Sequence, residues 1–229
     1  NAPIGIPYTV VCGNQEKIPV MFTDYGDERD AGPYPIPLNA PIEGNGIGDA
    51  HVIAVDLENG MLYELFNAHV SGNSWYASSG AIFNLKTNDL RPETWTSADA
   101  AGLPIFPGLV RFEETEKGVI DHALRFTLNS SNVKPAYIYP ARHKVNSSGG
   151  VYSLPFGARI RLKPDVDISS YSARNRIILQ AMKKYGLILA DIGSNMYVTG
   201  PPDERWDNND LQQLGQLKGS DFEVVKFNN

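Results

Sequence analysis

The chain has 229 residues, of which 42% are hydrophobic and 20% charged, and its formal net charge is −6. This composition is that of a globular protein and excludes a wholly disordered chain, while the negative charge opposes general binding to nucleic acid or anionic membrane. No apolar run reaches the roughly 18 residues of a membrane span, and Cys12, as the only cysteine, cannot form an intramolecular disulfide.

The first 45 residues are rich in Pro and Gly, and four prolines between positions 33 and 41 are spaced too closely for a helix or a central strand. We therefore predict an extended N-terminal arm over residues 1–45. The remaining residues, 46–229, are predicted to form a single β-rich globular domain, since sheet proteins of this length are commonly one domain. An arm of this kind offers a route to a homo-oligomer or larger assembly by docking on a neighbouring copy.

The clearest local pattern is a hairpin around Asn59-Gly60. Residues 51–56 and 61–66 are largely apolar, and an Asn-Gly pair between two such runs favours a two-residue turn. A two-residue loop would pair Val55 with Glu64. Glu64 is then expected on an apolar face of the hairpin.

Apolar alternation between turn residues predicts further strands at 81–85, 109–112, 120–128, 136–139, 158–163, 187–191, 195–199 and 222–225. The segments 187–191 and 195–199 are expected to form a hairpin. An amphipathic helix is predicted from Ser172 to Tyr185, ending at Gly186, and a short C-terminal helix from Asp207 to Leu214. These elements indicate a mainly β fold, with antiparallel sheets arranged as a β-sandwich or jelly roll.

One segment is more distinctive than the rest of the chain. Residues 94–105 read TWTSADAAGLPI, and residues 122–126 read HALRF. Together with residues 107–111 and 185–186, they resemble a group of uncharacterised secreted proteins of soil bacteria, with the likeness running from about residue 51 to 225. The resemblance implies an extracellular location and a polysaccharide-rich setting, and it supplies no activity or catalytic residue.

Within this segment, residues 96–102 are predicted to form one helical turn. Thr96 and Asp99 have the spacing of a capping box, which competes with a catalytic role for Asp99. The sequence contains no nucleophile elbow, P-loop, dinucleotide fingerprint or zinc-protease motif. It therefore predicts neither a cofactor nor a metal site.

Four residues are the candidate catalytic groups. Burial of Glu64 would raise its pKa, as a glycosidase acid requires, and Asp191 is a candidate partner carboxylate. His122 and His143 are candidate acid–base groups, because an imidazole titrates near pH 6.5. The alternatives are a buried ion pair for the carboxylates and a hydrogen-bonded core position for His122.

Five further residues are candidates for substrate binding. Arg125 and Arg161 belong to two predicted strands whose polar faces would form a basic strip if the strands were neighbours, and arginine binds carboxylates in bidentate fashion. Trp75, Trp95 and Tyr139 could stack on sugar rings. A solvated sheet face and core packing are the alternatives.

These residues predict a secreted protein that acts on an acidic polysaccharide or oligosaccharide, as a glycoside hydrolase or a polysaccharide lyase. The alternative is a non-catalytic carbohydrate-binding module or a self-assembling structural protein. An enzyme requires convergent titratable groups with perturbed pKa values, whereas a module requires an exposed aromatic surface.

Overall fold

The computed structural model describes residues 4–226, which are mainly β, with fourteen strands in four sheets and three α-helices among them. The chain divides into two compact units. Unit 1 extends to Phe106 and includes Tyr139–Val145, and unit 2 consists of Pro107–Ile138 and the chain from Asn146 onward. Each unit has its own sheets and is described separately.

The expected N-terminal arm is built into unit 1 from residue 4 on, and its first three residues lie outside the described part. It supplies strands β1 (Thr9–Val11) and β2 (Val20–Phe22), each of which joins a sheet. Tyr34 and Ile36 have no exposed surface. The segment therefore forms part of a core, and one boundary between the two compact units falls between Phe106 and Pro107.

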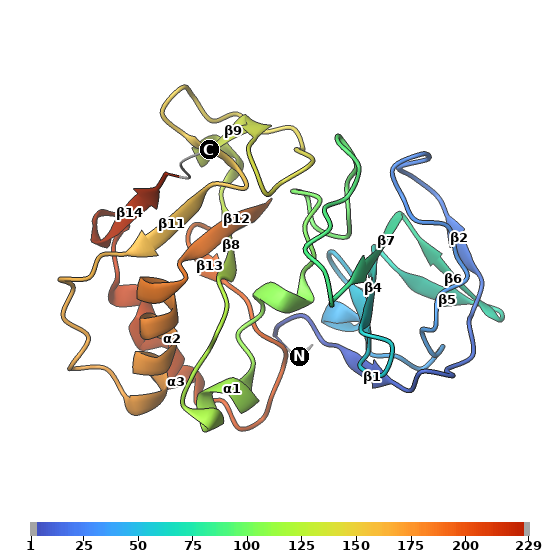
Figure 1. The fold of residues 1–229 in the computed structure, drawn as a ribbon, viewed down its shortest axis with the longest axis horizontal. Coiled ribbons are helices and arrows are strands. Elements are labelled where there is room, and N and C mark those ends of the chain that lie inside the picture. The colour runs from blue at the N-terminus through green and yellow to red at the C-terminus, as the bar shows by residue number, and fades with distance from the viewer. Residues whose placement is uncertain (1–3, 227–229) are drawn as a thin grey trace. The chain divides into compact units, whose positions relative to one another are not determined.

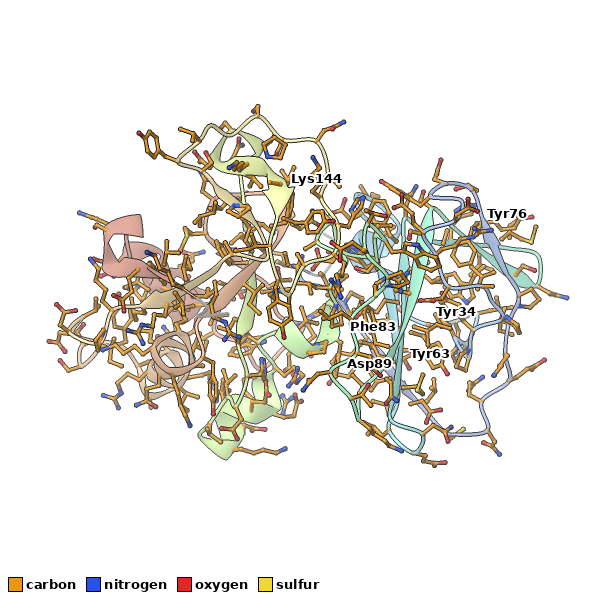
Figure 2. The ribbon with its side chains drawn as sticks, turned by 45° about the horizontal axis from the view of Figure 1, so that its top comes forward. Tyr34, Tyr63, Tyr76, Phe83, Asp89 and Lys144 are labelled. Atoms are coloured by element: carbon orange, nitrogen blue, oxygen red, sulfur yellow. The ribbon has the colours of Figure 1, made fainter. Side chains whose placement is uncertain are left out.

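Unit 1 contains two sheets that share one hydrophobic core (Figure 1). The first has the order β1-β3-β4-β7, and the second has the order β2-β6-β5. The shared core includes Tyr34 and Tyr63, whose ring centroids are 5.7 Å apart (Figure 2). The remaining strands are β3 (Val52–Asp56), β4 (Met61–Phe66), β5 (His69–Ser71), β6 (Ser74–Ala77) and β7 (Ser79–Asn84).

The predicted hairpin of β3 and β4 is present, with a different register. Ile53 pairs with Glu64 and Asp56 pairs with Met61, so the loop has four residues and not two. Asp56 accepts a hydrogen bond from the Asn59 amide at 3.0 Å, which stabilises the longer loop. Because the register differs by two residues, Glu64 stays on the expected face. That face is opposite to the one that packs on the second sheet.

Unit 2 contains a five-stranded sheet of order β13-β8-β12-β11-β14 and a separate pair of parallel strands, β9 and β10. The amphipathic helix is confirmed as α2 (Ala173–Lys184), which contacts β11 (Figure 1). The short C-terminal helix is α3 (Asn208–Gln212). The strands are β8 (Leu124–Leu128), β9 (Val133–Tyr137), β10 (Leu154–Phe156), β11 (Arg159–Leu162), β12 (Leu187–Ile192), β13 (Tyr197–Val198) and β14 (Phe222–Val225).

Several predictions for unit 2 are wrong, and the strand expected at 120–128 begins only at Leu124. The expected strand at 109–112 does not form, and Phe112 instead begins helix α1 (Phe112–Lys117), where the Glu114 carboxylate accepts the Arg111 amide and caps the helix. The expected hairpin of β12 and β13 does not form, since β8 lies between them. The mainly β class is confirmed, whereas the sheets mix parallel and antiparallel pairs and the sandwich or jelly-roll arrangement stays a prediction.

Candidate functional site

The distinctive segment forms a tightly bonded loop in unit 1, which we call the motif loop (residues 94–106). The Ser97 hydroxyl donates to the Leu103 carbonyl at 2.6 Å and accepts the Asp99 amide at 2.9 Å. The Gly102 amide donates to the Asp99 carbonyl at 3.1 Å. The segment is thus a turn and not the predicted helical turn, and Ser97, not Thr96, caps the Asp99 amide.

Glu64 anchors the motif loop to β4. Its carboxylate accepts the Ile105 amide at 3.0 Å and the Phe106 amide at 2.9 Å, and the side chain has no exposed surface. Burial raises the pKa of Glu64 to about 7, and the negative charge of Asp99 acts in the same direction. The hydrogen bonds from the Ile105 and Phe106 amides and the charge of His51 lower this pKa but do not outweigh burial. The predicted rise in pKa is present, but no solvent or substrate reaches the carboxylate.

His51 provides a second buried anchor, which sequence reasoning missed. One ring nitrogen, Nδ1, lies 2.5 Å from Glu43 Oε2, and Nε2 lies 2.9 Å from the Ala98 carbonyl. Burial lowers the pKa of His51, but the hydrogen bond and charge of Glu43 outweigh it, so the pKa is raised above its ordinary value. His51 and Glu64 therefore fix the loop to the sheet at both of its halves.

Arg142 and His143 are hydrogen-bonded to the motif loop through their backbones. Their amides donate to the Ala101 carbonyl at 2.9 and 3.2 Å, and the Thr94 amide donates to the Arg142 carbonyl at 2.8 Å. Gly102 lies beneath them with φ +68, and a Cβ there would come within 2.5 Å of the Trp95 carbonyl and 3.4 Å of the Cβ atoms of both residues. The motif glycine is the sequence signal for this close packing.

The His143 ring has one fixed and one open nitrogen. Nδ1 lies 2.8 Å from the Ala100 carbonyl, a contact in which the nitrogen must donate. Nε2 lies 3.6 Å from Glu28 Oε2, too far for a hydrogen bond, and this buried carboxylate oxygen has no hydrogen-bond partner. The side chain is 16% exposed. An imidazole held in one tautomer, whose other nitrogen makes no hydrogen bond, is suited to accept a proton.

The other predicted histidine, His122, has both nitrogens engaged. It precedes β8 in unit 2, with Nδ1 at 2.8 Å from the Ala123 carbonyl. Its Nε2 lies 3.1 Å from Glu114 Oε1 and 3.2 Å from Arg111 Nη2. Since neither nitrogen is left for a substrate, the alternative of a satisfied structural histidine fits His122.

Three predicted polar residues, Arg125, Asp191 and Arg161, lie on the five-stranded sheet of unit 2. Strand β12 separates β8 from β11, so the expected neighbouring strands do not meet, although Arg125 and Arg159 both align with Ile188. Arg125 is 5% exposed and donates to Thr199 Oγ1 at 3.2 Å, while Arg161 is paired with Glu223 at 2.5 Å. Arg125 and Arg161 therefore already have hydrogen-bond or ion-pair partners within unit 2.

The predicted stacking residues all belong to unit 1 and have different environments. Trp75 has no exposed surface, and its indole donates to the Ile36 carbonyl at 3.0 Å, so its ring packs in the core. Trp95 is partly buried under the Arg91 guanidinium, 5.5 Å from its ring centroid. Tyr139 is 64% exposed, four residues before His143. Of the three rings, Tyr139 is the one most available to a ligand.

Among residues 4–226, no group of three or more His, Cys, Asp or Glu side chains is arranged to hold a metal ion. Within the same part of the chain, no helix combines the length and apolar character needed to cross a membrane. Comparison of the chain with protein-family models, with curated proteins and with solved structures gives no match.

Proposed function

We propose that this chain is an extracellular enzyme that cleaves an acidic polysaccharide by β-elimination, with His143 as the general base. The observation that carries the proposal is the geometry of His143: Nδ1 is held by the Ala100 carbonyl, Nε2 makes no hydrogen bond, and the side chain is 16% exposed. The secreted setting rests on the resemblance of the 94–105 segment. The rigid mount on the motif loop supports the proposal, because a base must be held in a fixed orientation to act efficiently.

The reaction needs few protein groups. His143 Nε2 takes the proton from the carbon α to a uronate carboxylate, and the electron pair of that bond forms a carbon–carbon double bond. The glycosidic carbon–oxygen bond on the β carbon breaks, and the leaving oxygen takes a proton from solvent. Glu28, 3.6 Å from Nε2, stabilises the imidazolium that forms.

Elimination fits unit 1 better than hydrolysis does. A glycoside hydrolase uses two carboxyl groups that flank the bond, one of them protonated. The carboxyl group with the raised pKa in unit 1 is Glu64, which is fully buried and accepts two backbone amides. The candidate partner carboxylate, Asp191, belongs to unit 2. Glu64 therefore enters the proposal as the anchor of the motif loop and not as an acid.

The runner-up is a carbohydrate-binding module without catalysis, which the 64% exposure of Tyr139 favours. In either case we propose a sandwich scaffold for unit 1, supported by the hydrophobic core that its two sheets share.

The test is a screen of the purified chain against pectate, alginate, hyaluronan and neutral glucans. The absorbance of unsaturated uronate products, the release of reducing ends and binding by thermal shift are followed together. We expect the wild-type protein to produce both the absorbance of unsaturated uronate and new reducing ends. His143→Asn should lose both signals. Asparagine keeps an N–H that can donate to the Ala100 carbonyl but has no basic nitrogen. Reducing ends without absorbance would indicate a hydrolase, and binding alone would favour the module.

A further inference from the structure

The guanidinium next to His143 has features of a ligand-binding group. Both backbone hydrogen-bonding groups of Arg142 are bonded to the motif loop, to Ala101 and Thr94, so its Cα is as firmly placed as that of His143. The Arg142 side chain forms an ion pair from Nη1 to Glu93 Oε2 at 2.5 Å. Its Nε is buried and has no hydrogen-bond acceptor. The protein itself thus leaves part of this guanidinium unused.

Arg91, a structural arginine in the same unit, has a hydrogen-bond acceptor for each guanidinium nitrogen. Its Nε donates to the Thr96 carbonyl, Nη1 to the Asp30 carboxylate and Nη2 to the Glu28 carbonyl, and the side chain is 3% exposed. Every nitrogen of this guanidinium therefore has an acceptor in unit 1. Arg142, at 32% exposed, has neither the burial nor the full set of partners.

The ion pair between Arg142 and Glu93 is open to water. The Glu93 side chain is 57% exposed, and an ion pair between exposed side chains contributes little to stability because water solvates both charges. An external carboxylate can therefore take the place of Glu93 at small cost. A guanidinium binds a carboxylate through two parallel hydrogen bonds, which makes such an exchange favourable.

From this geometry we infer that Arg142 is the residue that binds the substrate carboxylate, and that Glu93 occupies its guanidinium until the substrate displaces it. The inference rests on the proposed function, since a carboxylate on Arg142 would bring the adjacent α proton toward His143. It assigns Arg142 a role in specificity for uronate-containing chains over neutral ones. It assigns Glu93 the role of an internal competitor.

Affinity measurements on a non-cleaving background test this inference. In His143→Asn, the dissociation constants of galacturonate, alginate and hyaluronan oligosaccharides and of a neutral glucan oligosaccharide are measured by calorimetry. We expect at least one acidic oligosaccharide to bind, and Arg142→Lys to weaken it by about 10-fold or more, because lysine cannot form the bidentate pair. Glu93→Gln is expected to tighten it by about 2- to 5-fold. The neutral oligosaccharide should respond to neither change.

The matched control is Glu223→Gln in unit 2, which removes the exposed partner of Arg161 from an ion pair of the same 2.5 Å length. It should leave every affinity unchanged. Thermal melting of each variant confirms folding. No binding of any acidic oligosaccharide, equal binding of acidic and neutral ones, or an unchanged affinity in both Arg142→Lys and Glu93→Gln would overturn the inference.

The two proposals fail separately. Cleavage that requires His143 but is unaffected by Arg142→Lys would leave the proposed function in place and remove the role of Arg142. Binding that depends on Arg142, in a protein that never yields unsaturated products, would keep the role of Arg142 and remove elimination as the activity.

Discussion

Units 1 and 2 each contain a partly exposed histidine beside a glutamate, His143 with Glu28 and His122 with Glu114, and the two histidines differ in the hydrogen bonds of Nε2. In unit 2, both nitrogens of His122 are engaged, by the Ala123 carbonyl and by Glu114 with Arg111. In unit 1, His143 uses Nδ1 alone, and Nε2 stays 3.6 Å from Glu28. The comparison shows that residue type and partial burial do not distinguish a structural histidine from a candidate base. The hydrogen bonds of the second nitrogen do.

The largest expected effect comes from removing each imidazole in turn. His143→Asn should lower the rate of polysaccharide cleavage by about 10²-fold or more, the contribution expected of a general base. His122→Asn should leave the rate within about 2- to 3-fold of wild type, because His122 serves packing and capping in unit 2. Initial rates of uronate absorbance on the same substrate compare the two. A similar loss in both variants would remove the distinction between the pairs.

Glu64→Ala removes the carboxylate that anchors the motif loop, to which His143 is hydrogen-bonded. The Ile105 and Phe106 amides would lose their buried acceptor, so we expect the free energy of unfolding to fall by about 3 kcal/mol at pH 6, as measured by urea titration. Hydrogen exchange of both amides should accelerate. Glu114→Ala, which deletes the cap of α1 in unit 2, should cost about 1 kcal/mol. Unchanged exchange at residues 105 and 106 would contradict the anchoring role.

The pH dependence of the free energy of unfolding should reflect two buried groups of unit 1, Glu64 and His51. The pKa of Glu64 is raised from 4.5 to about 7, so the folded state holds a proton that the unfolded state releases, and stability falls as pH rises between these values. The raised pKa of His51 acts in the same direction, since its stabilisation is lost as pH rises above its folded pKa. The free energy of unfolding should decrease by up to roughly 3 kcal/mol from Glu64.

Glu64→Gln provides the control for this dependence. The amide cannot titrate, so the decline between pH 4.5 and pH 7 should become shallower in urea titrations at several pH values. A variant with the same slope as wild type would show that Glu64 does not cause it.

The smallest expected effects come from replacing two glycines, Gly102 and Gly118, by alanine. Both have a positive φ, but only Gly102 is closely packed. Gly102→Ala should destabilise the protein by about 2 kcal/mol, because φ is +68 and the new Cβ would lie 2.5 Å from the Trp95 carbonyl. Gly118→Ala in unit 2, with φ +83 and no atom within 4 Å, should cost about 1 kcal/mol. Only the first should also slow cleavage. Thermal melting and initial rates measure both.

Local patterns in the sequence predicted the elements better than their pairing. The apolar stripe with Ser172 and Gly186 predicted helix α2 closely, and the face of Glu64 was predicted despite a register that differs by two residues. The hairpin of β12 and β13 was wrong, because adjacency in sequence does not reveal that β8 inserts between them. Such long-range pairing depends on packing that no local pattern records.

The candidate site was predicted only in part. His143 was a candidate by residue type, but the bond of Nδ1 to Ala100 requires the fold to bring residue 143 to the motif loop. His51 was missed because no local pattern links it to its partners: Ala98 lies 47 residues away, and Glu43 lies eight residues away in a different element. The one signal within reach was the glycine at the end of the TWTSADAAG segment, which indicates a backbone that packs too closely for a side chain.

The most direct test of the central claim is the protonation of the four imidazoles, observed by long-range ¹H–¹⁵N correlation at pH 8 without any substrate. We expect His143 to carry its proton on Nδ1 and its Nε2 to resonate as an unprotonated nitrogen without a hydrogen bond, whereas Nε2 of His122 should show the shift of a hydrogen-bonded nitrogen. A proton on Nε2 of His143, or a hydrogen-bonded shift there, would contradict the assignment of this residue as the base.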